Sequence, residues 1–451
     1  MPRPAASARA QRERILEGMV DAASRRGYGG ASVSEVIAAA GISRATFYEH
    51  FSSRDDCFLA AYRRSARCCA SRLADSPAEG EDPLRLLVTA ILTAAEADPA
   101  AAAFLTIDSR GNRLTRADRL ALQHEVELAV EEGLRARRRA GAPVLLPARA
   151  LLGGIESVVA LRVFKGEAQK ICPRLFDLLA WIDSYALPGG GAPPLELDWG
   201  PGVDEAEPGP RKTSPASTPR LPRGRSALAA AEAAAEQRRR TVATVARLSR
   251  ERGCEGFTVN DLVCAAGISR SAFYELFRNK ADAFQAAQTF ALQSSIAVAA
   301  GAFFGAAEWP DRVWSGLEAL LAHLAAEPDL TCVDLVEALG AGPEAVGRFF
   351  ENRLAFTLFL NEGYSLRIGK RGLPNLCSEA IGGAILELLR AEIHERGPES
   401  LVRALSIAVY VAIAPFIGPE EAIAFVRRKL SERTGGEAAA RAGSDATPIP
   451  G

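Results

Sequence analysis

The feature that most constrains the fold of this chain is an internal repeat. Residues 32–51 read SVSEVIAAAGISRATFYEHF, and residues 258–277 read TVNDLVCAAGISRSAFYELF. The two segments align without a gap, from Ser32 with Thr258 to Phe51 with Phe277, and 11 of the 20 positions are identical. A gapless repeat of this kind indicates that one structural unit is present twice in the chain.

Each copy has the spacing of a helix-turn-helix preceded by one further helix. We expect the preceding helices over 11–26 and 236–252, because apolar residues recur there at helical intervals. Gly27 and Gly253 follow these helices directly, and glycine is a common helix C-terminal residue. The pattern therefore predicts two three-helix units with the same internal layout.

Small polar residues and glycines mark the ends of the second and third helices in both copies. The second helix is expected to begin with a capping box, in which a hydroxyl and a carboxylate satisfy free backbone N–H groups. The capping-box pairs are Ser32 with Glu35 and Thr258 with Asp261. Gly41 and Gly267 supply the left-handed turn before the third helix. The hydroxyl that begins the third helix leaves N–H groups there free to approach a phosphate.

The third helix is predicted to contact DNA. An arginine near the start of a helix in the major groove can reach guanine, and a tyrosine hydroxyl suits a phosphate oxygen. A cation three positions after the last phenylalanine lies where it can hold the DNA backbone. The predicted DNA-binding residues of the first copy are Ser43, Arg44, Thr46, Tyr48, His50 and Arg54. Those of the second copy are Ser269, Arg270, Ser271, Tyr274 and Lys280. The second copy has Ala272 and Leu276 in place of Thr46 and His50, so it lacks two polar contacts.

The charge distribution agrees with two nucleic-acid contacts. The whole chain of 451 residues has a net charge of −1, which indicates nothing about partners. Residues 1–67, however, carry 11 Lys and Arg against 7 Asp and Glu, and residues 225–280 carry 10 against 6. Both repeats therefore lie in locally basic segments, as a surface that binds phosphates requires.

The chain divides into two halves of similar length. Residues 188–226 are rich in Pro, Gly, Ser and charge, which predicts a disordered linker. Strand-like alternation is nearly absent, so the predicted fold is all-α. The predicted domains are 9–69 and 235–295 for DNA binding, 70–187 and 296–433 for ligand binding and dimerisation, and 434–451 as a disordered tail. Residues 1–8 are also expected to be disordered.

The repeated pattern resembles the N-terminal domain of the tetracycline-repressor (TetR) family of transcriptional regulators. It consists of an apolar helix, G-[YC]-x-G-x-[ST]-V, AAGISR, FYxxF and then a basic residue three positions on. The resemblance implies a ligand-responsive repressor whose C-terminal domains dimerise through their last two helices. Family members usually have one unit per chain and act as homodimers, whereas this chain carries two. It is therefore expected to form an intramolecular pseudo-dimer on double-stranded DNA, with a quasi-palindromic operator and a small-molecule effector.

Two other interpretations remain open at this stage. In the first, halves from different chains dimerise and form a DNA-bridging assembly with four DNA-binding units. In the second, the protein is a small-molecule or protein-binding helical module whose DNA-binding units are vestigial. Trp181, Tyr185, Trp314 and Phe356 either line a ligand pocket or belong to the core.

Several classes of function have no support in the sequence. We find no phosphate loop, nucleophile elbow, metal-ligand spacing or paired carboxylates, so we expect no enzyme, metal or cofactor. The eight cysteines contain no CxxC pair, which favours reduced thiols in the cytoplasm. No signal peptide is visible, and the apolar segment 407–417 is too short to span a membrane, so it is predicted to be a buried helix.

Overall fold

Helices account for nearly all of the ordered structure. The computed structural model describes residues 4–74, 82–187, 227–366 and 372–444. Within these ranges there is no strand, apart from an isolated bridge between Val144 and Ala186. The predicted all-α fold is therefore confirmed. The predicted linker, 188–226, lies outside the described residues.

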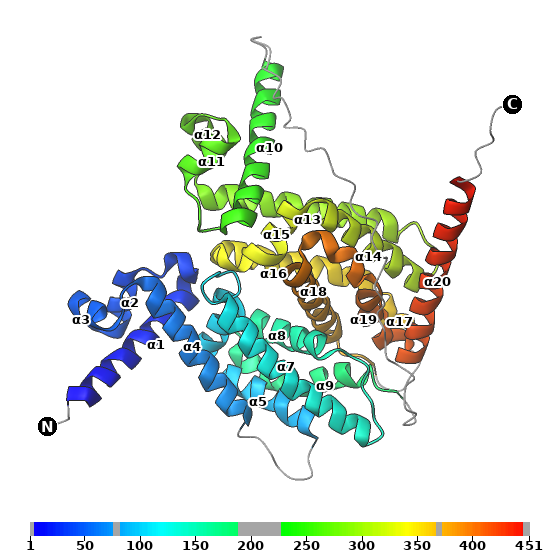
Figure 1. Ribbon diagram of the computed structural model, residues 1–451, viewed down its shortest axis with the longest axis horizontal. Helices are drawn as coiled ribbons and strands as arrows, with labels where there is room; N and C mark the ends of the chain where they lie inside the picture. Colours follow the sequence, from blue (N-terminus) through cyan, green and yellow to red (C-terminus); the bar gives the residue numbers. More distant parts are fainter. Residues whose placement is uncertain (1–3, 75–81, 188–226, 367–371, 445–451) are drawn as a thin grey trace.

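The first half consists of a small N-terminal domain followed by a helical body (Figure 1). The helices of the N-terminal domain are α1 (Pro4–Gly30), α2 (Val33–Ala40), α3 (Arg44–His50) and α4 (Arg54–Ala74). The body contains α5 (Pro83–Ala97), α6 (Pro99–Ala103), the π-helical turn η1 (Phe104–Asp108), α7 (Arg116–Arg139), α8 (Ala148–Phe164), η2 (Ala168–Lys170), η3 (Cys172–Arg174) and α9 (Leu175–Asp183).

The second half repeats this order and then continues further. Its N-terminal domain contains α10 (Ala227–Arg252), α11 (Val259–Ala266), α12 (Arg270–Leu276) and α13 (Lys280–Phe303). Its body contains α14 (Trp309–Ala326), α15 (Pro328–Cys332), η4 (Val333–Glu337), η5 (Ala338–Gly340), α16 (Pro343–Thr357), η6 (Leu358–Leu360), α17 (Gly363–Leu366), α18 (Leu376–Arg396), η7 (Pro398–Ala404), α19 (Leu405–Ile417) and α20 (Pro419–Ser444).

Both ends of the described chain are more helical than the sequence analysis expected. Helix α1 already begins at Pro4, and α20 continues to Ser444, whereas 1–8 and 434–451 were predicted to be disordered. Both segments contain several alanines, and the second also contains Glu437 and Arg441, which are strong helix formers. The local helix preference therefore prevails in 4–8 and 434–444.

Each N-terminal domain has its own hydrophobic core. Helix α1 buries the face that the sequence predicted, including Ile15, Met19 and Ala23, which are all 0% exposed. In α10 the matching face includes Val245, which is also fully buried. Gly27 has a φ of 70°, so the helical conformation of α1 breaks where the sequence predicted its end.

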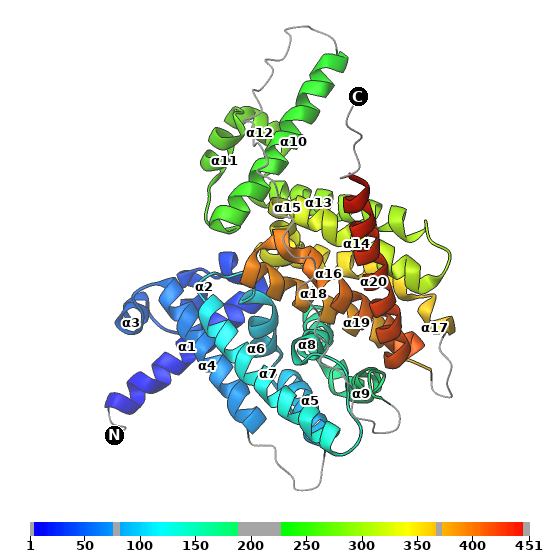
Figure 2. The ribbon, with the colours of Figure 1, turned by 45° about the vertical axis from the view of Figure 1, so that its right-hand side comes forward.

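The two bodies share one hydrophobic core, because α8 of the first half packs directly against α18 of the second (Figures 1 and 2). Glycines allow this close approach. A Cβ atom at Gly383 would lie 2.5 Å from the carbonyl oxygen of Gly153 and would collide with Ser157. A Cβ atom at Gly153 would lie 2.8 Å from the carbonyl oxygen of Gly383. The two helix backbones therefore touch through a reciprocal, nearly two-fold pair of contacts.

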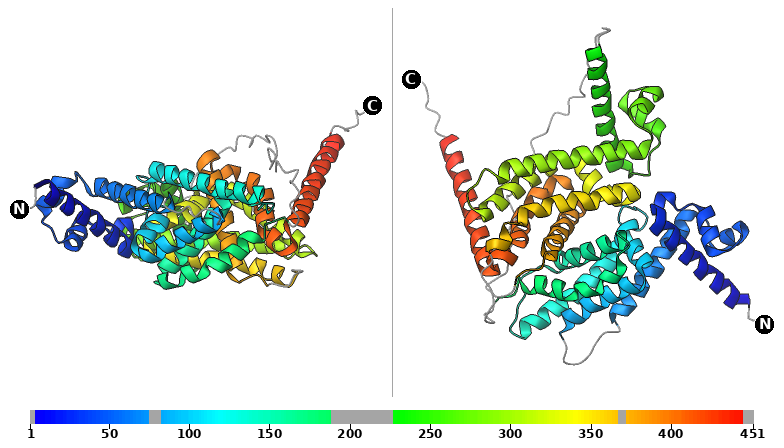
Figure 3. Two further views of the ribbon diagram at one scale, coloured as in Figure 1. Left: turned by 90° about the horizontal axis from the view of Figure 1, so that it is seen from below. Right: turned by 180° about the vertical axis from the view of Figure 1, so that it is seen from behind.

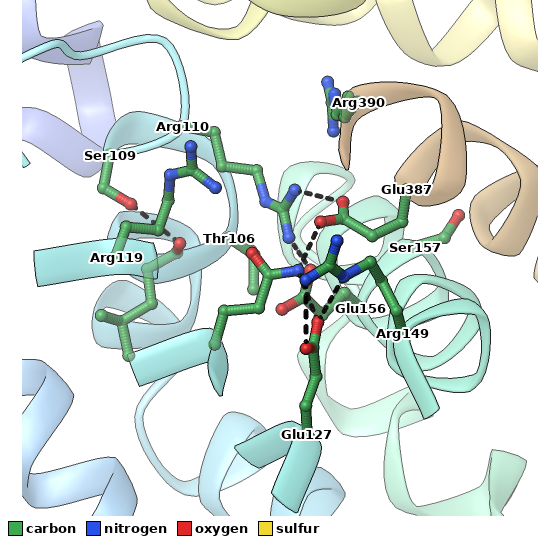
Figure 4. A network of polar contacts seen from close by, with 12 residues as sticks. Thr106, Ser109, Arg110, Arg119, Glu127, Arg149, Glu156, Ser157, Glu387 and Arg390 are labelled. Atoms are coloured by element: carbon green, nitrogen blue, oxygen red, sulfur yellow. Dashed lines mark hydrogen bonds and ion pairs between the residues drawn. The ribbon is translucent and has the colours of Figure 1, made fainter. Parts of the chain in front are cut away.

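A network of charged side chains borders this crossing, with contributions from both halves (Figure 4). Arg110 donates to Glu387 at 2.7 Å and also pairs with Glu156. Burial alone would raise the pKa of Glu387, but Arg110 and Arg390 outweigh that effect and hold the pKa at about 2. The carboxylate is consequently ionised and paired, as a buried charge must be for the fold to tolerate it.

The second half does not use its last two helices for this interface. The sequence analysis expected the last two helices of each half to meet. In the structure α18 and α19 face the first half, where the hydroxyl of Tyr185 donates to the carbonyl of Val411 at 2.8 Å. Helix α20 is an additional helix that packs on α19 and lies at the outer edge of the molecule (Figures 1 and 3).

One described segment, Pro398–Ile417, is long and apolar enough to cross a membrane, and the bent pair Pro83–Ala97 and Pro99–Asp108 would be a second if it formed one span. In Pro398–Ile417, 72% of the apolar window is buried inside the protein. Val409, Tyr410 and Ile413 of α19 are 0% exposed. The segment therefore belongs to the shared core, as the buried-helix prediction for 407–417 proposed.

The close crossing of α8 and α18 can be tested with two adjacent glycines. The position of a Cβ atom at Gly382 has no neighbouring atom within 4 Å, whereas at Gly383 it overlaps α8. We expect Gly382→Ala to stabilise the protein by about 0.5–1 kcal/mol through helix propensity. Gly383→Ala should instead destabilise it by about 1–3 kcal/mol through overpacking. Urea unfolding of the two variants measures the difference, and equal effects would contradict this interface.

Candidate DNA-binding site

The turn between α2 and α3, and its copy between α11 and α12, have the local geometry that the sequence predicted. Ser32 and Glu35 form a complete capping box at the start of α2. Thr258 and Asp261 form the same box at the start of α11. Gly41, which ends α2, has a φ of 62°. This left-handed conformation favours glycine and turns the chain toward the next helix.

The predicted caps of α3 and α12 are present. The Ser43 hydroxyl accepts a hydrogen bond from the backbone N–H of Thr46 at 3.0 Å. The Ser269 hydroxyl accepts from the N–H of Ala272 at 3.1 Å. The first turn of a helix has further N–H groups without a partner in the helix, and the helix dipole favours an anion there.

Arginine and tyrosine share the outer face of both third helices, while phenylalanines hold the inner face to the core. Tyr48 is 50% exposed and Tyr274 is 48% exposed, although both are large apolar residues. The Arg44 guanidinium lies 6.0 Å from the centre of the Tyr48 ring, and Arg270 lies 5.8 Å from Tyr274. Phe47 and Phe273, one position before these tyrosines, turn toward the core and are 0% exposed. Each third helix therefore presents a basic and aromatic surface.

The other predicted residues of the third helices are partly engaged with their own helix. The hydroxyls of Ser43 and Thr46 lie 2.9 Å apart, and so do those of Ser269 and Ser271. His50 is half-buried near the end of α3. Ser43 caps α3, and Thr46 and His50 lie on α3 with Arg44 and Tyr48, while Ser269 and Ser271 have the same relation to α12.

Arg54 and Lys280 differ from the exposed arginines because the side chains of both make contacts within the protein. The Arg54 guanidinium stacks at 4.1 Å over the Tyr28 ring, and its side chain is 31% exposed. The Lys280 ammonium donates to the carbonyls of Cys254 and Phe257 at 2.9 and 3.1 Å. Each cation therefore ties the start of the fourth helix to the loop after the first helix, and its direct effect is on domain geometry.

Sequence reasoning missed an arginine on the first helix of each domain. Arg12 lies 5.1 Å from the Phe51 ring centre, and Arg238 lies 4.7 Å from that of Phe277. Arg238 also donates to the carbonyl of Leu276 at the end of α12. The two arginines occupy equivalent positions in the internal repeat, so extending the alignment of the two copies toward the N-terminus could have identified them.

The two N-terminal domains are attached to the bodies differently. The turns η1 and η4 occupy equivalent places in the two halves and align residue by residue, so Asp108 corresponds to Glu337 and Arg113 to Gly342. Glu337 accepts from the backbone N–H of Cys254 at 2.9 Å. The shorter Asp108 is 7% exposed, and one of its carboxylate oxygens has no hydrogen-bond partner.

Arg113 strengthens the attachment of the second domain only. It donates to the carbonyls of Glu251, Ser249 and Arg250 at 3.1, 3.4 and 2.8 Å, which places a cation at the negative end of α10. At the equivalent contact of the first domain, Gly27 meets Gly342, which has no side chain. The first domain is therefore held to the bodies by fewer polar contacts.

Comparison with known proteins shows that both N-terminal domains match one protein family. The family model of bacterial regulatory proteins of the tetR family matches residues 15–61 and 242–287. No protein with a curated description matches the chain. A proposed tetR family transcription regulator from Shewanella sp. PV-4 is 19% identical, with 39% of this chain and 98% of that one aligned and a TM-score of 0.34. A TetR-like transcriptional regulator from Rhodococcus sp. RHA1 is 23% identical, with 37% and 92% aligned and a TM-score of 0.31.

The buried carboxyl of Asp108 leads to a prediction about pH. Burial raises the pKa of Asp108 well above its usual value, so ionisation of this group opposes folding. The resulting loss of stability is absent below about pH 4, which is the pKa of an aspartate in the unfolded chain. It grows as the pH rises toward the higher pKa that Asp108 has in the folded protein. Asp108→Asn should therefore gain stability over the wild type as the pH rises from 4 to 7. Urea unfolding at each pH measures this gain, and a difference independent of pH would contradict the explanation.

Proposed function

We propose that this chain, a tetR-family regulator with two tandem units, binds one DNA operator with both of its N-terminal domains and represses transcription. The observation that carries the proposal is the joint placement of the two third helices. Each presents an exposed arginine and tyrosine, and each belongs to a domain attached to a body that shares one core with the other half. One chain then supplies what a homodimer of single units supplies with two chains.

The shared core supports an intramolecular arrangement over a DNA-bridging assembly. The α8–α18 crossing and Tyr185 already occupy the faces through which halves of different chains would pair. A tethered partner also has an effective concentration in the millimolar range, which favours docking within one chain. The full chain should therefore bind its operator as a monomer.

A cavity in the second body is the proposed effector site. It has a volume of about 160 Å³ and is lined mainly by apolar side chains of α13, α14, α16 and α18. Since a single water needs roughly 10–15 Å³ on this measure, the cavity has room for a small organic molecule. Asp334 and Asn352 are polar groups in its wall, and burial raises the pKa of Asp334 to about 6.

The aromatic residues considered as pocket residues separate into two groups. Phe356 lines the cavity in the second body. Trp181 and Tyr185 are 0% exposed in the shared core, and Trp314 is 4% exposed and packs against Phe425. A ligand in the cavity would therefore contact Phe356 directly and the three other aromatic residues only through neighbouring side chains.

The proposed roles of Arg44 and Tyr48 can be separated by mutation. Arg44→Ala should weaken operator binding by about 1–3 kcal/mol and relax base preference, because a bidentate contact to guanine would be lost. Tyr48→Phe should weaken binding to all sequences to a similar extent, because a phosphate contact carries no sequence information. Binding to a panel of single-base operator variants at fixed salt distinguishes the two. Wild-type affinity in both variants would contradict the site assignment.

The two third helices should read half-sites that are related but different. Both contain arginine and tyrosine at the same positions, whereas Thr46 and His50 are replaced by Ala272 and Leu276. Alanine and leucine can contact a thymine methyl but cannot replace a polar contact. Exchanging His50 and Leu276 should therefore reverse the preferred orientation of an asymmetric operator, as measured by footprinting. A symmetric consensus that the exchange does not alter would count against this idea.

The effector cavity predicts one ligand per chain. The fluorescent probe 1-anilinonaphthalene-8-sulfonate should bind once, and Ala299→Leu, which extends into the cavity, should abolish this binding while leaving operator affinity unchanged. Ala140→Leu, at an exposed helix end in the first body, is the control and should keep the probe site. Equal probe fluorescence in both variants would place the probe elsewhere.

A further inference from the structure

A second cavity lies between the two halves and is rich in arginine. It has a volume of about 160 Å³ and is bordered by the loop before α7, the first turns of α7, the end of α10 and the end of α18. Its lining includes Arg110, Arg113, Arg116, Arg119, Arg250 and His394. Glu337 is the one carboxylate that lines it. We refer to this cavity as the arginine cleft.

Pairing with carboxylates accounts for only part of this positive charge. Arg110 pairs with Glu387 and Glu156, as described above. Arg250 pairs with Glu399 at 2.7 Å and with Asp329 at 3.3 Å. Within the described part of the chain, however, neither Arg116 nor Arg119 has a carboxylate partner. The arginine cleft therefore carries excess positive charge.

Arg116 and Arg119 both contact the imidazole of His394. Arg116 lies 3.2 Å from Nδ1 and Arg119 lies 3.3 Å from Nε2. Burial, together with these two arginines, lowers the pKa of His394 to about 4, so the ring is neutral at pH 7. A neutral imidazole has one N–H and one acceptor nitrogen, while a guanidinium only donates. One of the two contacts consequently places a donor against a donor, and the cluster lacks an acceptor.

Arg119 is a buried cation without a full set of partners. It is 8% exposed, and its Nε has no hydrogen-bond partner. Burial, followed by the charge of Arg110, lowers the pKa of Arg119 to about 10. A buried guanidinium with an unused donor is costly for the fold unless an anion compensates it.

The positive end of the α7 helix dipole lies beside the cleft, because α7 begins at Arg116. Helix α7 is 24 residues long and begins at Arg116, and Thr115 provides no side-chain cap. The start of a helix carries partial positive charge and unsatisfied N–H groups, which suit a phosphate or another anion. The start of α7 therefore adds partial positive charge beside the arginine side chains of the cleft.

From this geometry we propose that the arginine cleft is a binding site for a small molecule with a phosphate group. Several charged donors from different directions match the three acceptor oxygens of a phosphate better than a single carboxylate. The depth of Arg119 favours a small molecule over a DNA backbone, because a duplex cannot enter a cavity of this size. The site is distinct from the apolar cavity of the second body, which lies between other helices.

The arginine cleft exists on one side of the pseudo-two-fold axis only. In the alignment that pairs η1 with η4, Arg110, Arg113 and Arg116 correspond to Leu339, Gly342 and Ala345. Arg119 corresponds to Arg348, which instead contacts Thr289 and Gln285. Arg348 therefore provides a matched control within the same chain. An anion bound in the arginine cleft would act next to the attachment of the second N-terminal domain.

Titration calorimetry with inorganic pyrophosphate, in the absence of DNA and at constant ionic strength, tests the proposal. We expect one site per chain, with inorganic phosphate binding more weakly and acetate not binding. Arg116→Ala and Arg119→Met should each weaken pyrophosphate binding about tenfold or more, since each removes a charge-assisted contact. Arg348→Ala should leave the affinity unchanged. Arg116 is exposed, so Arg116→Ala keeps the test valid if the buried Arg119 variant does not fold.

Three outcomes would overturn the proposal. The first is no pyrophosphate binding to the wild type at millimolar concentration. The second is an equal loss in Arg348→Ala and Arg116→Ala, which would indicate general charge attraction. The third combines two results: Arg116→Ala weakens binding to a DNA duplex that lacks an operator, and pyrophosphate does not bind. That combination would assign the cleft to the DNA backbone. Because the calorimetry contains no DNA, its result is independent of the proposed operator binding.

Discussion

The direct contact between the backbones of α8 and α18 is the constraint on which the rest of the structure depends. Gly153 and Gly383 allow each helix to touch a carbonyl of the other, and side chains of both bodies then close around the crossing. Close packing at such a contact admits little adjustment, so it fixes how the two bodies lie relative to each other. The positions of both N-terminal domains follow from that arrangement.

The backbone contacts between the two halves are nearly two-fold symmetric, whereas several polar contacts are not. The glycine contacts are reciprocal, and Gly111 lies against its counterpart Gly340 near the axis. In the turns that contain Gly111 and Gly340, the first half has Arg110 and Arg113 where the second half has Leu339 and Gly342. A single chain is free to diverge in this way, because two halves joined in one sequence can change independently. A homodimer must place every substitution on both sides.

This asymmetry connects the three sites discussed above. The second N-terminal domain is attached through Glu337 and Arg113, next to the arginine cleft, while the first lacks the equivalent contacts. The apolar cavity described above lies in the second body. The apolar cavity and the firmer attachment thus belong to the second half, while the more polar third helix, α3, belongs to the first.

Local sequence determined the helix-turn-helix units almost completely. Caps, turn glycines and the apolar spacing of each short helix depend on neighbouring residues, so Ser32, Gly41 and Ser43 predicted their own conformations. The internal repeat predicted the second unit from the first. By contrast, the commitment of Arg54 and Lys280 to intramolecular contacts, the extra helix α20 outside the interface and the arginine cleft were decided by tertiary structure. Each depends on which side chains meet across segments far apart in the chain, and such meetings leave no periodic signal in the sequence.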